Sequence, residues 1–210
     1  MKPILTIIMF CLVFASQAHA EQIKEENKHV RSWNDFAHKI LALHQQKIQN
    51  RNIKVEKSKG GYPHIKDWHY KEEKHLDKDT GNLITLIQWD GDKADQIHSI
   101  EHYVYDKQGR VIRDFTAAYL PSYHNAPTQT LISLHAYEKD LHAFRTFDAS
   151  GYRIVERCQG KYQGKSLQML LDEDEIAETQ YDNDSVMDTA SYKACFSSLP
   201  IEVGVYLEPQ

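Results

Sequence analysis

Apolar residues recur at steps of three and four positions early in the chain, which is the pattern of an amphipathic helix. Ser32, with Asp35 three residues later, suits a capping box at the start of this helix. We therefore expect a helix over about residues 32–50, with His44 as a structural residue on its apolar stripe. The other residues of the stripe are Trp33, Phe36, Ala37, Ile40, Leu41 and Ile48.

The periodicity is lost after this helix, where lysines are frequent. Gly60, Gly61 and Pro63 are strong breakers of regular structure. We expect a basic linker over about residues 51–67.

Short segments rich in β-branched and aromatic residues follow from about residue 68 to residue 171. Turn residues separate these segments, and such spacing predicts an antiparallel β-meander sheet. The pattern is compatible with a strongly curved sheet and with a partial barrel. The predicted strands include LITLIQW, IHSIEHYVY, RVIRDFTAAYL, TLISLHAY, LHAFRTF, YRIVERC and LQMLL.

Two predicted turns share the pattern D-x-x-G after an aromatic residue, at 106–109 and 148–151. An aspartate at the first position of a turn accepts hydrogen bonds from nearby backbone, and a glycine three residues later adopts the left-handed conformation at no steric cost. The shared residues therefore indicate one type of turn used twice, without any need for a bound ligand.

The C-terminal segment, residues 172–210, starts with the acidic run DEDEIAETQYDND. This run lacks the central glycine and the alternating acids of an EF-hand loop, whereas acids favour the first turn of a helix. A second helix is expected within about 185–198, and IEVGVYL is typical of a last strand. Helices that are segregated from an antiparallel sheet define the α+β class, so we predict a single α+β domain over residues 21–210.

The first twenty residues have the form of a secretory signal peptide. Lys2 precedes the apolar run ILTIIMFCLVFA, and the A-x-A pattern ends at Ala20, which predicts cleavage between Ala20 and Glu21. An uncleaved anchor is the alternative, although the apolar run is shorter than the about 20 residues that span a membrane. We expect a soluble periplasmic or secreted protein without a membrane span after removal of the signal.

Two cysteines, Cys158 and Cys195, remain in the exported chain. In an oxidising compartment they are expected to form one disulfide bond, which stabilises the fold by roughly 2–4 kcal/mol. The sequence contains no C-x-x-C motif that would indicate redox chemistry or a zinc site.

The charge of the chain argues against nucleic acid as a partner. The formal net charge is −5 and becomes −6 when the positive Lys2 is removed with the signal. A mildly acidic protein without a dominant basic face is a poor nucleic-acid binder.

Twelve histidines, one of them in the signal, raise the question of metal binding. His98 and His102 lie four residues apart, but the segment is strand-like, and four strand residues span about 13 Å. One metal ion cannot bridge that distance with bonds of about 2 Å. His64, His69 and His75 lie among lysines, so no metal site is identified and no cofactor is expected.

Signatures of catalysis are also weak. The sequence has no G-x-S-x-G nucleophile motif and no phosphate-binding loop. Asp114 and Glu156 could act as an acid–base pair. Across the sheet they could equally pair with the arginines Arg113, Arg145, Arg153 and Arg157.

One loop carries candidate binding residues: Tyr119, Tyr123, His124 and Asn125 lie between two predicted strands. Loops that are held by a rigid sheet often bind ligands, and tyrosine offers an apolar ring with a polar tip. The alternative is a plain connection whose tyrosines cover the edge of the core.

These features favour an exported, non-catalytic module that binds a protein partner or a small ligand in the cell envelope. The alternatives are a hydrolase-like enzyme with a site assembled from several strands, or a metal-binding protein that uses histidines.

Overall fold

The computed structural model describes residues 28–49, 51–61, 69–91, 96–119, 127–179 and 185–209. The predicted signal peptide and its cleavage site at Ala20 and Glu21 lie outside the described residues. The same holds for Tyr123, His124 and Asn125, and for His64.

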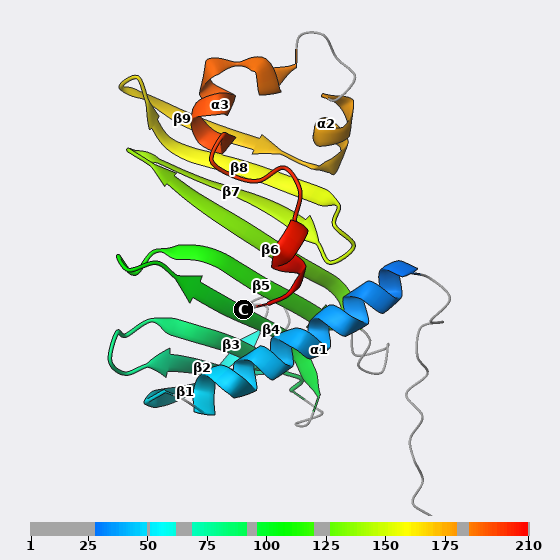
Figure 1. Cartoon of the computed structure of the whole chain (residues 1–210). Coiled ribbons are helices and arrows are strands. Elements are labelled where there is room, and N and C mark those ends of the chain that lie inside the picture. Colours follow the sequence, from blue (N-terminus) through cyan, green and yellow to red (C-terminus); the bar gives the residue numbers. More distant parts are fainter. Residues whose placement is uncertain are drawn as a thin grey trace, which may run out of the picture.

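A single nine-stranded antiparallel sheet forms the body of the protein (Figure 1). Each strand pairs with the next one in the sequence, so β1 and β9 are the two edges and the sheet is not closed into a barrel. The α+β meander expected from the sequence is thereby confirmed. The strands are β1 (Ile53–Gly61), β2 (His69–Asp77), β3 (Leu83–Trp89), β4 (Ile97–Tyr105), β5 (Val111–Tyr119), β6 (Pro127–Glu138), β7 (Leu141–Asp148), β8 (Arg153–Tyr162) and β9 (Lys165–Leu171).

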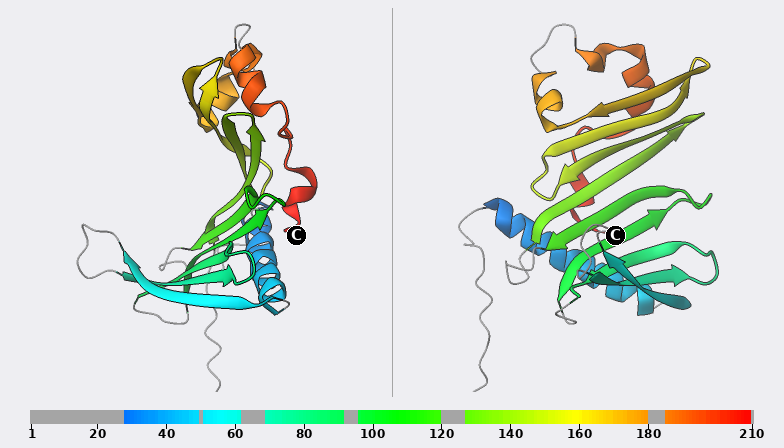
Figure 2. Two further views of the ribbon diagram at one scale, coloured as in Figure 1. Left: turned by 90° about the vertical axis from the view of Figure 1, so that its left-hand side faces the viewer. Right: turned by 180° about the vertical axis from the view of Figure 1, so that it is seen from behind.

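The helices all lie on one side of this curved sheet, on its convex face (Figure 2). The long helix α1 (Lys28–Gln49) crosses the middle strands. The C-terminal segment adds α2 (Glu173–Glu178), η2 (Val186–Asp188), α3 (Ala190–Phe196) and η3 (Gly204–Leu207). No described helix covers the concave face, which we call the open face.

The hydrophobic core lies between α1 and the sheet. Phe36 and Ile40 of α1 are buried, and the Phe36 ring meets the Phe115 ring edge-on at 6.0 Å. Phe115 is a cross-strand neighbour of Ile132, which in turn lies opposite Phe147. Because opposite residues of antiparallel strands face the same side, these apolar side chains form a continuous row under the helix.

A disulfide bond joins the C-terminal segment to the sheet, and a buried ion pair joins strands β7 and β8. Cys158 of β8 and Cys195 of α3 form the expected disulfide. Arg145 and Glu156 form an ion pair and are 2% and 0% exposed. Arg153 also lies 3.3 Å from Glu156. Glu156 is therefore paired with arginines, with Arg145 across the strand pair and with Arg153 within β8, as the alternative to an acid–base pair predicted.

Both D-x-x-G segments form the expected turns. Gly109 and Gly151 have φ angles of 76° and 92°. Asp106 Oδ1 accepts a hydrogen bond from the Gln108 backbone N–H at 2.8 Å, and Asp148 Oδ1 accepts one from the Ser150 N–H at 2.9 Å.

Three expectations about the elements need correction. Helix α1 already includes Lys28, so Ser32 lies inside the helix and does not cap it. Most of the expected basic linker is strand β1. Its charged side chains are compatible with an edge strand, because some of them pair with side chains of the neighbouring strand β2, as Lys57 does with Glu73 at 2.6 Å. The expected last strand is the 3-10 helix η3, which begins at Gly204 with a φ of 51°.

Among the described residues, no helix is long and apolar enough to cross a bilayer.

A cavity lined by cations as the candidate functional site

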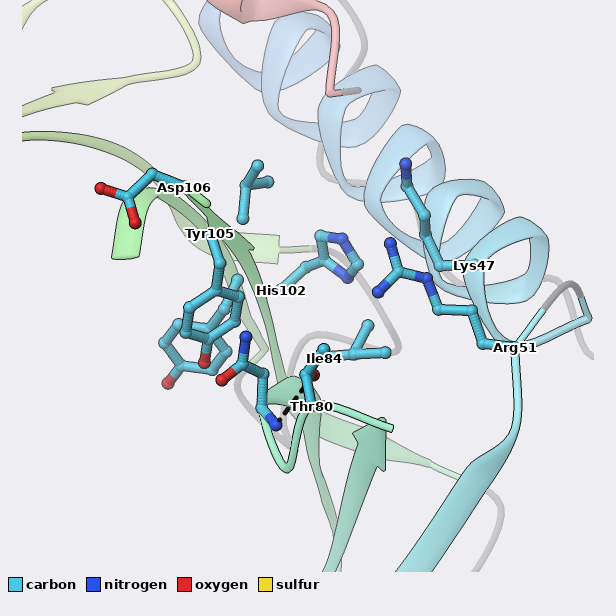
Figure 3. Close-up of a pocket in the computed structure, with 10 residues that line it drawn as sticks. Lys47, Arg51, Thr80, Ile84, His102, Tyr105 and Asp106 are labelled. Atoms are coloured by element: carbon cyan, nitrogen blue, oxygen red, sulfur yellow. Dashed lines mark hydrogen bonds between the residues drawn. The ribbon is translucent and has the colours of Figure 1, made fainter. Parts of the chain in front are cut away.

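A cavity of about 220 Å³ lies where the C-terminal end of α1 meets the β2–β3 turn and strand β4 (Figure 3). Since a water molecule occupies about 30 Å³ in the liquid, this volume suits a small organic ligand or the charged group of a larger one. The lining residues are Lys47, Arg51, Thr80, Asn82, Ile84, His102, Tyr103, Val104, Tyr105 and Asp106.

The local structure explains how the cavity is formed. Lys47 lies in the last turn of α1, where a cation is favourable beside the helix carbonyl groups. On the opposite wall, Asp77 Oδ1 accepts hydrogen bonds from the backbone N–H groups of Asp79 at 2.9 Å and Thr80 at 3.3 Å. These bonds hold the β2–β3 turn in place, and with it the polar wall of the cavity.

The cations of the cavity differ in how they are neutralised. Arg51 Nη1 lies 3.0 Å from Asp77 Oδ2. The side chain of Lys47, in contrast, has neither an ion pair nor a hydrogen bond with any residue in the described ranges. One positive charge at the wall of the cavity is therefore left for a ligand.

The acid that lines the cavity, Asp106, is already engaged. Its Oδ1 accepts from the backbone N–H groups of Gln108 and Arg110, and its Oδ2 accepts from Arg110 Nε at 2.8 Å. The Arg110 backbone hydrogen bond is the main cause that holds the pKa of Asp106 below its ordinary value. This carboxylate does not compensate Lys47, so the cavity favours an anion.

His102 supplies a buried polar group to the same cavity. Its Nδ1 lies 3.0 Å from the Thr85 hydroxyl, and its side chain is 1% exposed. Burial lowers its pKa to about 3, and the positive charge of Lys47 acts in the same direction. The imidazole is therefore neutral at physiological pH. When Thr85 donates to Nδ1, Nε2 carries the proton and is a donor for a ligand.

Two further histidines are buried nearby between α1 and the sheet. The rings of His44 and His75 meet edge-on at 4.7 Å, and each side chain is 7% exposed. Burial lowers the pKa of His44 to about 4 and also lowers that of His75. Within the described ranges, no group of three or more histidine, cysteine, aspartate or glutamate side chains is placed to hold a metal ion.

The structure separates the residues that the sequence singled out. Tyr119 is 8% exposed in the core, where burial raises its pKa to about 12. The other three candidates of its loop lie outside the described residues, so a site there stays a prediction. His98 contacts the Tyr70 ring at 4.3 Å, whereas His102 bonds to Thr85.

Sequence reasoning missed Lys47, Arg51, Thr80 and Asn82 as members of one site. A basic last turn of a helix is a common stabilising feature, so Lys47 carried no functional signal. The fold alone brings it close to the β2–β3 turn and to His102.

Comparison with known protein families, with curated proteins and with solved structures finds no match to this chain. Its function therefore has to be inferred from the geometry of its own residues.

Proposed function

We propose that this protein is an exported, non-catalytic module that binds a small ligand through a carboxylate or phosphate group in the cavity beside α1. The observation that carries the proposal is the unneutralised Lys47 at a wall that also holds the buried imidazole of His102. Charge-assisted hydrogen bonds to an oxyanion are among the stronger polar interactions in proteins.

Several donors of the cavity suit such a group. The Arg51 guanidinium has five N–H donors, and one nitrogen, Nη1, is engaged with Asp77. Figure 3 shows the His102 imidazole pointing toward the Arg51 guanidinium. An oxyanion between these groups would accept hydrogen bonds from His102 Nε2, Arg51 and Lys47.

Binding fits the cavity better than catalysis does. Its lining includes neither a serine nor a cysteine, the hydroxyl of Thr80 accepts from the Asn82 backbone N–H at 3.3 Å, and its histidine is engaged by Thr85. Nucleophilic catalysis requires a nucleophile activated by an adjacent base.

Export to the periplasm or beyond the cell belongs to the same proposal. The predicted signal peptide supports it, and the Cys158–Cys195 disulfide is compatible with an oxidising compartment. A small ligand in the cell envelope is therefore the partner that we propose.

The test is a titration of the chain from Glu21 to Gln210 with inorganic phosphate and, separately, with succinate at low ionic strength. The imidazole signals of His102 in NMR spectra report binding, because a hydrogen bond from Nε2–H of the neutral ring to the anion changes the chemical shifts of the ring. We expect saturable shifts and an affinity at least ten-fold weaker in Lys47→Gln.

Lys161→Gln is the matched control, since Lys161 is an exposed lysine of β8 outside the cavity. It should bind the anion as the unmodified protein does. Equal affinities for all three proteins, or no saturable shift at His102 with either anion, would reject the proposal.

A further inference from the structure

Three parallel rings form a row on the open face of the sheet. Tyr137 and His142 stack at 4.5 Å with an angle of 4° between the rings, and His142 and His135 stack at 5.3 Å with an angle of 12°. The guanidinium carbon of Arg110 lies 4.7 Å from the centre of the Tyr137 ring. At the other end, His135 Nε2 lies 2.6 Å from Asp114 Oδ2.

Strand register places these side chains together. Tyr137 of β6 lies opposite His142 of β7, and His135 lies opposite Phe144. Directly opposite residues of antiparallel strands share one face, so these rings lie on the same side of the sheet. Phe144 also packs against His135, with ring centres 5.5 Å apart.

The hydrogen bonds of the row determine which nitrogen carries each proton. A carboxylate only accepts, so Nε2 of His135 must donate to Asp114. When the His135 ring is neutral, its Nδ1 is an acceptor, and it lies 3.0 Å from Nε2 of His142. His142 Nε2 is then the donor of that bond, and Nδ1 of His142 keeps a lone pair that no residue of the described ranges engages.

His142 also lines a depression of about 510 Å³ at the edge of the open face. Most of its lining side chains can form hydrogen bonds, and the charges of Lys139 and Asp140 have opposite signs. The lining consists of Tyr137, Lys139, Asp140, Leu141, His142, Gln159, Gly160, Ser166, Leu167 and Gln168.

We propose that this depression is a second binding site, for a neutral carbohydrate, with Nδ1 of His142 as a fixed hydrogen-bond acceptor. The amides of Gln159 and Gln168 each offer a donor and an acceptor, which match sugar hydroxyl groups. The balanced charge of the lining does not favour an ion. This site lies apart from the cavity beside α1 and uses none of its residues.

The experiment uses the chain from Glu21 to Gln210 with ¹⁵N-labelled histidine. At pH 8 we expect both His135 and His142 to carry their proton on Nε2. An Nδ1 proton on His142 at pH 8 would overturn the assignment.

Binding is then measured at pH 8 with maltotriose and with tri-N-acetylchitotriose. We expect a saturable shift of His142 Nδ1 with at least one trisaccharide, an affinity at least ten-fold weaker in Gln168→Ala, and no change in Lys47→Gln. No saturable shift with either sugar, or a response to a tetra-alanine peptide alone, would overturn the carbohydrate site. Phosphate binding in the other cavity has no bearing on this outcome.

Discussion

Replacing Glu156 by glutamine removes the negative charge of a buried ion pair while keeping the size and shape of the side chain. Glu156 Oε1 accepts from Arg145 Nε, and its Oε2 accepts from the Tyr192 hydroxyl at 2.7 Å. Arg145 also donates to the backbone carbonyls of Leu199 and Pro200, at 2.9 and 2.7 Å. The substitution therefore leaves a buried guanidinium without its counter-ion at the point where the C-terminal segment meets the sheet.

The size of the effect follows from this burial. Removing one partner of a buried ion pair costs about 3–5 kcal/mol. Glutamine keeps one oxygen acceptor for Arg145, and the backbone carbonyls remain, so we expect the lower end, about 3 kcal/mol. With an m value of about 2–3 kcal/mol per molar urea, the midpoint of unfolding should fall by about 1–1.5 M.

Urea unfolding of the chain from Glu21 to Gln210, with the disulfide intact, measures this change. Glu138→Gln is the control, because Glu138 is an exposed glutamate of β6, and its substitution should change stability by less than about 0.5 kcal/mol. A loss below about 1 kcal/mol in Glu156→Gln, at an unchanged m value, would show that the pair does not stabilise the fold as its burial implies.

Acid should weaken the contact of α1 with the sheet. The pKa of buried His44 is about 4 in the folded protein, compared with 6.5 as its ordinary value, so the unfolded chain binds this proton more tightly and stability falls as the pH drops from 6.5 to about 4. We expect this residue to lower the free energy of unfolding by on the order of 2 kcal/mol, measured as a lower urea midpoint. His44→Leu should lose less stability over the same pH range, and equal pH dependence of the two proteins would contradict the prediction. In a different part of the fold, Gly160→Ala should destabilise the protein by roughly 3 kcal/mol, because a Cβ atom at φ 142° would lie 1.9 Å from the Asp140 carbonyl oxygen. Gly164→Ala, with a positive φ but nothing within 4 Å, should cost about 1 kcal/mol in the same urea unfolding assay, and similar losses for the two variants would rule out the steric explanation.

Features that depend on neighbouring residues in the chain could be predicted from the sequence. The two D-x-x-G turns formed as expected because Asp106 and Asp148 bond to backbone groups only a few residues away. The meander followed from strands and turns that alternate along the chain. The disulfide followed because Cys158 and Cys195 are the cysteines left once the predicted signal is removed.

Expectations based on side-chain pattern alone were less secure. The pattern of β1 predicts a linker because its lysines and Glu56 hide the apolar alternation, whereas part of its charge is balanced only across the strand pair, as in Lys57–Glu73. The β-branched residues near Gly204 suggested a strand. A strand also needs a partner, and this segment forms a 3-10 helix in which Tyr206 N–H bonds to the Val203 carbonyl.

The sequence by itself determined the two D-x-x-G turns, the α+β class and the disulfide, since these depend on short-range chemistry and on residue counts. The tertiary structure decided which face of the sheet the helices cover. It also placed Lys47 of α1 in one cavity with His102 of β4, and joined Asp114, His135 and His142 from three strands into one row. Both candidate sites depend on distances between residues of different elements. Such distances are set by packing and strand register, and the order of residues along the chain does not encode them in any short motif.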